Sequence, residues 1–243
     1  MGAAIGAVLR QRGLDVLWAS EGRSGATRER AERAGLLDAG TIAELAERSD
    51  VILSVCPPHA AADVARAIVG FAGIFLDANA ISPDTSRRIA GTVTHFVDGG
   101  IVGGPPSTES GPRLYVSGGD TERVVALFAE TTVDARVLSD RIGDASALKM
   151  VYAAWTKGTA ALLLAIREVA VREGVADPLF QEWRASLPEL ESRLASADRS
   201  AAAKGWRWVA EMEEIAATFA AAGEPEGFHR AAAEIFRRHE RMF

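Results

Sequence analysis

One lysine in this sequence has surroundings that favour proton transfer. Lys149 lies about one turn into a long apolar stretch, within the segment GDASALKMVYAAWTKG (143–158). A lysine held against an apolar wall has a lowered pKa and can exchange protons near neutral pH. Tyr152 and Thr156 follow at helical spacing, so we expect them on the same face, in contact with a substrate. The alternative is a lysine at the start of a helix that extends its ammonium group into solvent.

A polar turn after the segment DVLWAS (15–20) has the side chains needed to bind a phosphate. Ser20, Arg23 and Ser24 combine a guanidinium group with two hydroxyls. In a dinucleotide-binding fold the second strand ends beside the adenosine ribose. A guanidinium and hydroxyls there suit the 2′-phosphate of NADP. Glu21 leaves NAD as the alternative cofactor, and an ordinary polar turn is the structural alternative.

Two further strand ends carry candidate cofactor contacts. In the tract ILSVCPP (52–58) a predicted strand ends, and the residues that follow it are candidate cofactor contacts: Cys56, Pro57 and Pro58. The tract DANAISP (77–83) ends another strand, and the amide of Asn79 can reach a nicotinamide or a ribose. We expect Asp77 to organise the turn instead.

The segment DGGIVGGPP (98–106) is a candidate substrate loop directly after a predicted strand. Its glycines permit close approach of a backbone, and exposed N–H groups of such a loop can bind a carboxylate or a phosphate. We therefore expect Val102, Gly103 and Gly104 beside the substrate. A flexible connection is the alternative, although two adjacent prolines stiffen the segment.

The first residues follow the order glycine, helix, glycine and strand, with Gly2 before a predicted helix at 3–12 and Gly13 after it. This order follows the last glycine of a GxGxxG dinucleotide loop, which makes Gly2 a candidate cofactor contact. A complete loop also needs a preceding strand and two earlier glycines. We therefore expect a nucleotide-binding domain whose first strand is missing, and a plain N-terminal helix is the alternative.

The elements that must position these residues change in kind near residue 143. Before it, apolar strands alternate with helices of about ten residues, a pattern that predicts a mostly parallel sheet with helices on both faces. The predicted strands lie at 15–20, 50–55, 73–77, 95–98, 113–117 and 136–138. After it only helices are predicted, at 145–172, from 177 through Trp183, at 200–222 and at 228–239.

Composition excludes several classes of protein. The chain has 243 residues and a net charge of −6, which gives no electrostatic footprint for nucleic acid. No apolar run approaches the roughly 18 residues of a membrane span, and no secretory leader pattern follows the N-terminus. The single cysteine excludes an internal disulfide and a cysteine-rich metal site. We expect a cytoplasmic enzyme or binding protein that takes a small molecule and no metal.

Taken in order, these motifs resemble the β-hydroxyacid dehydrogenase superfamily, which includes the 3-hydroxyisobutyrate and 6-phosphogluconate dehydrogenases. The resemblance covers nearly the whole chain, and the second half is most similar to a poorly characterised bacterial phosphogluconate-dehydrogenase-like branch. It implies a Rossmann-type NADP-binding domain at 1–143 and an all-helical domain at 144–243. It also implies a homodimer whose two chains associate through their helical domains. It also implies that Lys149 is the general acid/base of hydride transfer.

Three departures from that family matter for function. Val102 stands where the family has a serine, Ala153 stands where it has an asparagine, and Gly2 matches only the third loop glycine. We expect an NADP-dependent oxidoreductase that moves a hydride to or from a small β-hydroxyacid-like substrate. An imine reductase is one alternative, which the retained Lys149 disfavours. A non-catalytic NADP-binding or dimerisation protein is the other, which Val102 and Ala153 favour.

Overall fold

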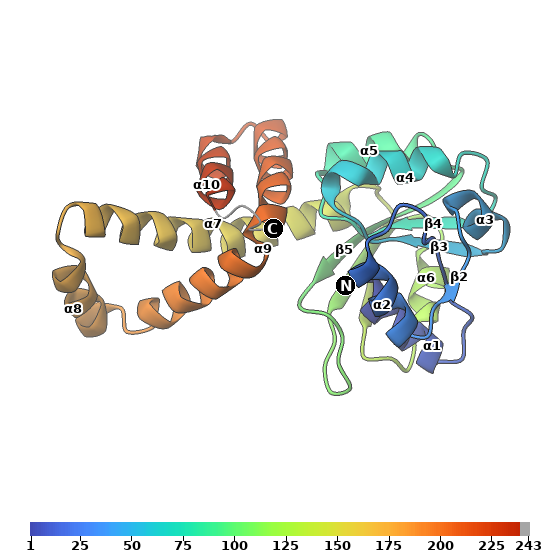
Figure 1. Cartoon of the computed structure of the whole chain (residues 1–243). Helices are drawn as coiled ribbons and strands as arrows, with labels where there is room; N and C mark the ends of the chain where they lie inside the picture. Colours follow the sequence, from blue (N-terminus) through green and yellow to red (C-terminus); the bar gives the residue numbers. More distant parts are fainter. Residues whose placement is uncertain (239–243) are drawn as a thin grey trace. The chain divides into compact units, whose positions relative to one another are not determined.

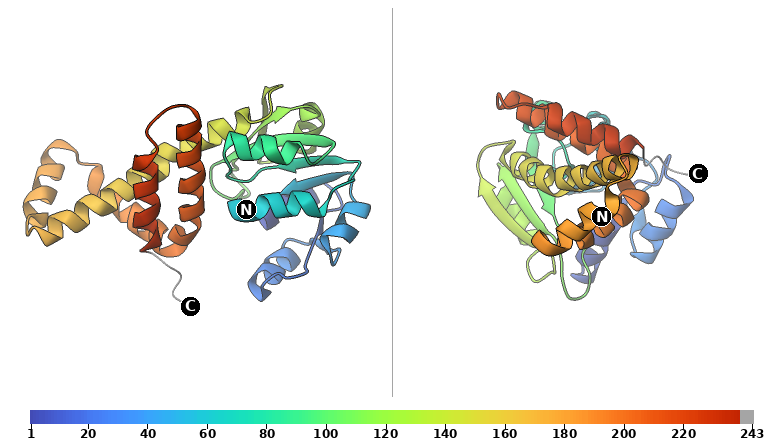
Figure 2. Two further views of the ribbon diagram at one scale, coloured as in Figure 1. Left: turned by 90° about the horizontal axis from the view of Figure 1, so that it is seen from above. Right: turned by 90° about the vertical axis from the view of Figure 1, so that its left-hand side faces the viewer.

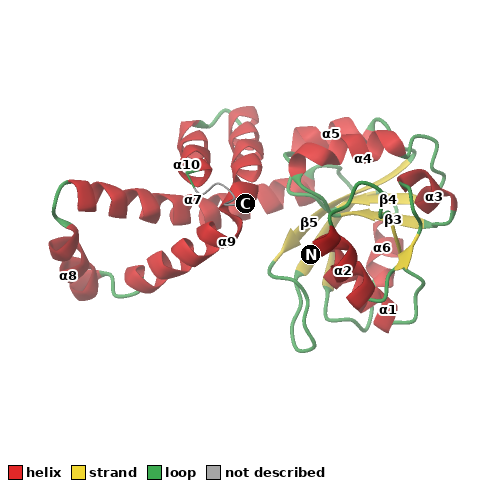
Figure 3. Ribbon diagram, viewed as in Figure 1, coloured by secondary structure: helices red, strands yellow, loops and turns green. Residues whose placement is uncertain are grey.

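The computed structural model describes residues 1–238 and divides the chain into two compact units (Figure 1). The first unit comprises Met1–Lys149 and the second begins at Met150. The division falls within helix α7 (Asp144–Arg172), whose first residues belong to the first unit. Figure 3 shows that the strands belong to the first unit and that the second is helical. This is the predicted α/β region followed by an all-helical region.

The first unit alternates short strands and short helices. Its strands are β1 (Leu17–Trp18), β2 (Leu37–Asp38), β3 (Val51–Ser54), β4 (Ile74–Asp77), β5 (His95–Val102), β6 (Arg113–Gly118) and β7 (Asp134–Ser139). Its helices are α1 (Gly2–Gln11), α2 (Gly25–Arg33), α3 (Ile42–Glu47), α4 (Ala61–Ala67), α5 (Pro83–Ala90), α6 (Thr121–Leu127) and a 3-10 turn at Pro58–Ala60.

The strands form two sheets among the described residues. One has the order β3-β4-β5-β6-β7, and every neighbouring pair in it is parallel except β5 and β6. The other is the parallel pair of β1 and β2. The prediction of a mostly parallel sheet is therefore confirmed, whereas the two-residue β2 was missed because it is too short to show a pattern.

Apolar side chains cover both faces of the larger sheet, which makes it doubly wound. On one face, residues of α1 and of α6 and its C-terminal turn pack on the strands in a cluster that includes Ile5, Val8, Leu76, Val97, Val116, Val124 and Phe128. On the other face α4 and α5 pack on a cluster that includes Ile52, Ala61, Ala65, Phe75, Ile89 and Phe96. Burial of both strand faces explains why the strands read as continuous apolar runs.

A row of polar residues crosses the larger sheet at one level. In the strand register Ser54 pairs with Asp77, Asp77 with Asp98, Asp98 with Ser117, and Ser117 with Ser139. Residues paired in this way point to the same face of a sheet. The first four are almost completely buried. We call this set the polar row.

Two predicted helix starts are confirmed. Thr41 and Glu44 form the capping box expected for α3, each side chain bonding the other's backbone N–H. Pro83 opens α5, and the Ser82 side chain accepts a hydrogen bond from the Thr85 N–H.

The prediction of a glycine loop from Asp98 to Pro106 was wrong for its first half, because β5 continues to Val102. Gly99 and Gly100 lie within β5 and allow neighbouring residues to pack closely against this strand. A Cβ on Gly99 would lie 2.9 Å from the Leu76 side chain, and one on Gly100 would lie 2.5 Å from the Ala145 carbonyl oxygen. Only the part after Val102 is a loop.

The second unit contains the rest of α7 with α8 (Ala176–Ser186), α9 (Leu190–Ala221) and α10 (Gly227–Arg237). Helix α9 begins ten residues earlier than the predicted 200, since the charged segment before it is also helical. The last residue of the predicted fourth helix, His239, lies outside the described residues. Helices α9 and α10 lie side by side (Figure 2). The rings of Trp208 and Phe236 meet edge to face, with 5.0 Å between their centroids. No helix of the described part could cross a membrane.

Candidate active site

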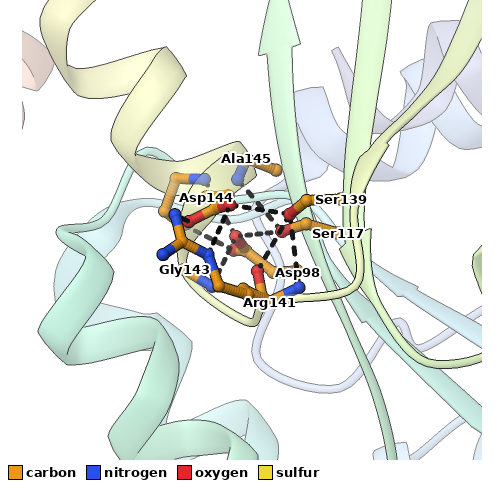
Figure 4. Close-up of polar contacts among 8 residues, drawn as sticks. Asp98, Ser117, Ser139, Arg141, Gly143, Asp144 and Ala145 are labelled. Atoms are coloured by element: carbon orange, nitrogen blue, oxygen red, sulfur yellow. Dashed lines mark hydrogen bonds and ion pairs between the residues drawn. The ribbon is translucent and has the colours of Figure 1, made fainter.

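The carboxylate of Asp98 is the centre of the densest polar network in the first unit (Figure 4). It is completely buried and accepts hydrogen bonds from three elements. The hydroxyls of Ser86 and Ser146 donate to Oδ1 at 2.8 and 2.6 Å. The hydroxyl of Ser117 and the backbone N–H groups of Gly143 and Ser146 donate to Oδ2 at 3.0, 3.1 and 2.9 Å.

This network fixes the first turn of α7 on strands β5 and β6. The Ser117 hydroxyl also accepts a hydrogen bond from the Ala145 N–H at 3.0 Å, and Ser139 donates to the Asp144 carboxylate at 2.7 Å. Hydrogen bonds to the Asp144 carboxylate hold its pKa low, chiefly the one from Ser139 and then the one from Arg141. Two carboxylates at a helix N-terminus also interact favourably with the helix dipole.

Asp98 was not predicted as a site residue, because it stands where the predicted strand 95–98 meets the glycine-rich segment 98–106. A signal was present, since a single acidic residue stood between an apolar strand and a glycine pair.

Lys149 is positioned directly over β5 by the absence of a side chain at Gly100. A Cβ on Gly100 would lie 3.1 Å from the Lys149 Cβ and 2.5 Å from the Ala145 carbonyl oxygen. The side chain of Lys149 is half-buried, and its neighbours Ser146 and Met150 are completely buried. The lowered pKa of this lysine stays a prediction.

The other predicted substrate residues on α7 belong to the second unit. Tyr152 and Thr156 are exposed, and the Thr156 hydroxyl contacts the Ala153 carbonyl of its own helix at 3.4 Å. Ala153 is completely buried. The assistance that Tyr152 and Thr156 give to Lys149 stays a prediction.

Asn79 joins the ends of β3 and β4. Its Oδ1 accepts a hydrogen bond from the Cys56 N–H at 2.5 Å, and its Nδ2 donates to the Ser54 hydroxyl at 2.8 Å. The side chain is 3% exposed. Asp77 organises the turn as predicted, accepting the Asn79 N–H at 2.9 Å. The structure thus gives Asn79 a role within the protein, while its contact with a cofactor stays a prediction.

Asp77 contributes an unusual titratable group to the polar row. Its Oδ2 is buried without a hydrogen-bond partner among the described residues. Burial, with a smaller contribution from the nearby Asp98, raises the pKa of this carboxyl to about 6 against the opposing hydrogen bonds from Asn79.

The predicted phosphate-binding residues lie around the start of α2. Ser24 occupies the N-cap position without a capping hydrogen bond, and Arg23 and Ser24 are exposed. Ser20 is buried, and its contact with a phosphate stays a prediction. The pKa of Asp38 is lowered chiefly by the hydrogen bond from the Gly40 N–H and then by the side chain of Ser20.

The remaining cofactor candidates are at the ends of neighbouring elements. Gly2 opens α1, where a Cβ would make ordinary contacts with Val55. Pro57 is exposed, while Cys56 and Pro58 are half-buried. Burial raises the pKa of the Cys56 thiol, and the positive charge of Arg23 acts on it in the opposite direction.

The glycine pair after β5 is open to solvent, whereas Val102 is packed. Val102 is 4% exposed and lies at the end of the strand. Gly103 adopts a φ of 120°, which favours glycine, and Gly104 has free space around its Cα.

Comparison with known proteins finds similarity in sequence to a family of domains and to a further protein. Residues 170–239 match a family described as a domain of unknown function, DUF1932. An uncharacterized 28.5 kDa protein of Methanothermus fervidus is 30% identical over 164 residues, which cover 66% of this chain and 64% of that protein. The chain thus spans less than two thirds of the length of this relative.

A solved structure of a conserved protein of unknown function is 27% identical, with a TM-score of 0.70 over 98% of this chain and 92% of that one. Its description reports structural similarity with 3-hydroxyacid dehydrogenases. The chain is therefore similar, over nearly its whole length, to a protein with the fold of the 3-hydroxyacid dehydrogenases.

Two further structures extend the 3-hydroxyacid dehydrogenase likeness at the level of fold. A 3-hydroxyisobutyrate dehydrogenase of Mycobacterium tuberculosis, solved with L-serine, is 16% identical with a TM-score of 0.70, covering 98% of this chain and 89% of that one. A reductive aminase of Aspergillus terreus, solved with NADPH, is 18% identical with a TM-score of 0.60, covering 98% and 89%.

Proposed function

We propose that the protein is an NADP-dependent oxidoreductase that transfers a hydride to or from a small β-hydroxyacid-like substrate. The observation that carries the proposal is the placement of Lys149 over Gly100 by the Asp98 network. Similarity to 3-hydroxyacid dehydrogenases and to an NADPH-bound reductive aminase supports the reaction class and a nicotinamide cofactor.

The residues present fit a dinucleotide. Helices α1 and α2 both begin without a side-chain cap and without an acidic residue in the first turn. Their first N–H groups are therefore suited to phosphate oxygens. Arg23 and Ser24 add the charge and hydroxyl that suit a 2′-phosphate, and Glu21 keeps NAD as the alternative.

When bound, a nicotinamide supplies or accepts the hydride. The chain's own residues contribute proton transfer and positioning. The Lys149 ammonium group donates a proton to the substrate oxygen during reduction, and the neutral amine removes it during oxidation. Asp98 is a positioning residue, because its hydrogen bonds fix the helix that carries Lys149.

An imine reductase-like activity is the second candidate. The observation that favours it is the similarity in fold to a reductive aminase solved with NADPH. A non-catalytic NADP-binding or dimerisation protein is the third candidate, and the buried apolar residues Val102 and Ala153 favour it. The presence of Lys149 favours a dehydrogenase.

We also propose that the protein is a homodimer, joined through its helical unit, in the cytoplasm. Three large apolar side chains on α7 support the dimer because they are exposed in the single chain: Trp155, Leu162 and Val169.

The test of the function is the substitution Lys149→Met in the full chain, with Lys204→Met as a matched control. Fluorescence titration with NADPH and NADH first measures cofactor affinity. A panel of β-hydroxyacids and of imines then identifies the substrate class. We expect Lys149→Met to lower turnover of a β-hydroxyacid by about 10²- to 10⁴-fold without changing cofactor affinity. Unchanged turnover would refute the acid/base role, and turnover of imines alone would favour the second candidate.

A further inference from the structure

Arg113 is an exposed arginine near the end of β5. It is the first residue of β6 and pairs with Val102 across the antiparallel register. In the same register Tyr115 pairs with Gly100 and Ser117 with Asp98. Because Ser117 bonds both Asp98 and Ala145, this is the face on which α7 begins. Arg113 therefore shares a face of the sheet with Lys149.

The burial pattern of β6 supports this assignment of faces. Leu114 and Val116 are completely buried in the cluster with α1 and α6, on the opposite face. Arg113 is exposed and Tyr115 is half-buried, as alternation along a strand requires.

The guanidinium group of Arg113 forms no hydrogen bond or salt bridge within residues 1–238. The acidic residue paired with Arg113 in the register is Asp134. The pKa of Asp134 is lowered chiefly by the hydrogen bonds from Arg136, and the charge of Arg113 contributes less. Both Asp134 carboxylate oxygens accept from the Arg136 Nε, at 3.0 and 2.9 Å. Arg113 thus keeps donors for an external anion.

The distance from Arg113 to the proposed catalytic lysine suits a small molecule. Lys149 sits on Gly100, and Val102 lies two residues, roughly 7 Å, along the same strand. Arg113 stands one strand away from Val102, at about 5 Å between Cα atoms. Both side chains extend from the same face, so one small substrate can contact both.

We propose that Arg113 binds the carboxylate of the substrate and so restricts the enzyme to anionic hydroxy compounds. The packed Val102 provides no polar group at this position, and Gly103 and Gly104 provide only backbone N–H groups. A guanidinium group matches a carboxylate with two parallel hydrogen bonds. The inference rests on the proposed function in one respect, since it takes Lys149 as the group at the reacting carbon.

The test measures binding of three acids and of their methyl esters: 3-hydroxypropionate, 3-hydroxyisobutyrate and serine. Calorimetry with the full chain, with and without NADP⁺, gives affinities that do not depend on turnover. The variants are Arg113→Leu and Arg113→Lys. The matched control is Arg123→Leu, an exposed arginine on α6 that pairs with Asp120.

We expect Arg113→Leu to weaken binding of the acids by about 10- to 100-fold and to leave ester binding unchanged. Arg113→Lys should retain part of the acid affinity, and the control should retain all of it. Equal affinity of acids and esters for the unmodified chain, or an equal loss for both in Arg113→Leu, would overturn the proposal. So would the absence of binding by every acid.

The two proposals fail separately. If acids bind through Arg113 but no hydride is transferred, the carboxylate site stands and the dehydrogenase function does not. If a β-hydroxyacid turns over with the same KM in Arg113→Leu, the function stands and the carboxylate site does not.

Discussion

Gly100→Ala is the substitution that most directly tests how Lys149 is positioned. The added Cβ would lie 2.5 Å from the Ala145 carbonyl oxygen, and a carbon–oxygen contact normally needs about 3.3 Å. The first turns of α7 must therefore move away from β5 by about 0.8 Å. The obstacle is backbone, so no side-chain rotation relieves it.

Two magnitudes follow from this displacement. Overpacking of this kind costs about 1–3 kcal/mol of the free energy of unfolding, which lowers Tm by about 2–4 °C for each kcal/mol in a chain of this size. A catalytic group misplaced by about 1 Å costs on the order of 10²-fold in rate. NADPH affinity should stay near its original value, because the predicted phosphate contacts belong to other elements.

The assay compares Tm, NADPH affinity and turnover of Gly100→Ala with those of Gly119→Ala. Gly119 has no atom within 4 Å of its added Cβ, and therefore controls for the general effect of replacing a glycine. A normal Tm in Gly100→Ala would show that α7 does not pack as described. A lowered Tm with unchanged turnover would show that the position of Lys149 does not matter for the chemistry.

Two further predictions concern stability. Because burial raises the pKa of Asp77 from 3.8 to about 6, the folded chain retains a proton that the unfolded chain has lost, and stability falls as pH rises between these values. Urea unfolding should show a loss on the order of 3 kcal/mol above pH 6, which is absent in Asp77→Asn. Glu211→Gln should lower the free energy of unfolding by about 3 kcal/mol, since it leaves the nearly buried Lys157, 2.7 Å away, without its counter-charge. The double variant Lys157→Met with Glu211→Met should lose less.

The layers of the first unit could be predicted from the sequence because strand burial and helix capping leave local patterns. The apolar run of β3 and the capping box of Thr41 and Glu44 are such patterns, and both appear where expected. The short β2 and the early start of α9 could not be predicted, because two residues carry no period and a charged alanine-rich segment suits helix and loop alike.

The site could be predicted in part. The residue type and environment of Lys149 were visible in the sequence, whereas the network that positions it was not. Asp98 and Ser146 are 48 residues apart, and only the strand register brings them together. Arg113 was hidden for the same reason, because its partnership with Val102 depends on an antiparallel pairing within a sheet that is otherwise parallel.

The polar row also bears on how the strands find their partners during folding. A slip of one residue in any pairing would turn that strand's polar residue toward the cluster of Ile5, Val97 and Val116. For Asp98 this slip would bury a charge without its five hydrogen-bond donors, at a cost of several kcal/mol. Apolar side chains alone discriminate poorly between registers, because both faces of this sheet are apolar and a slip exchanges one for the other. The polar row, which includes the Asp98 that positions Lys149, therefore also favours the native strand register during folding.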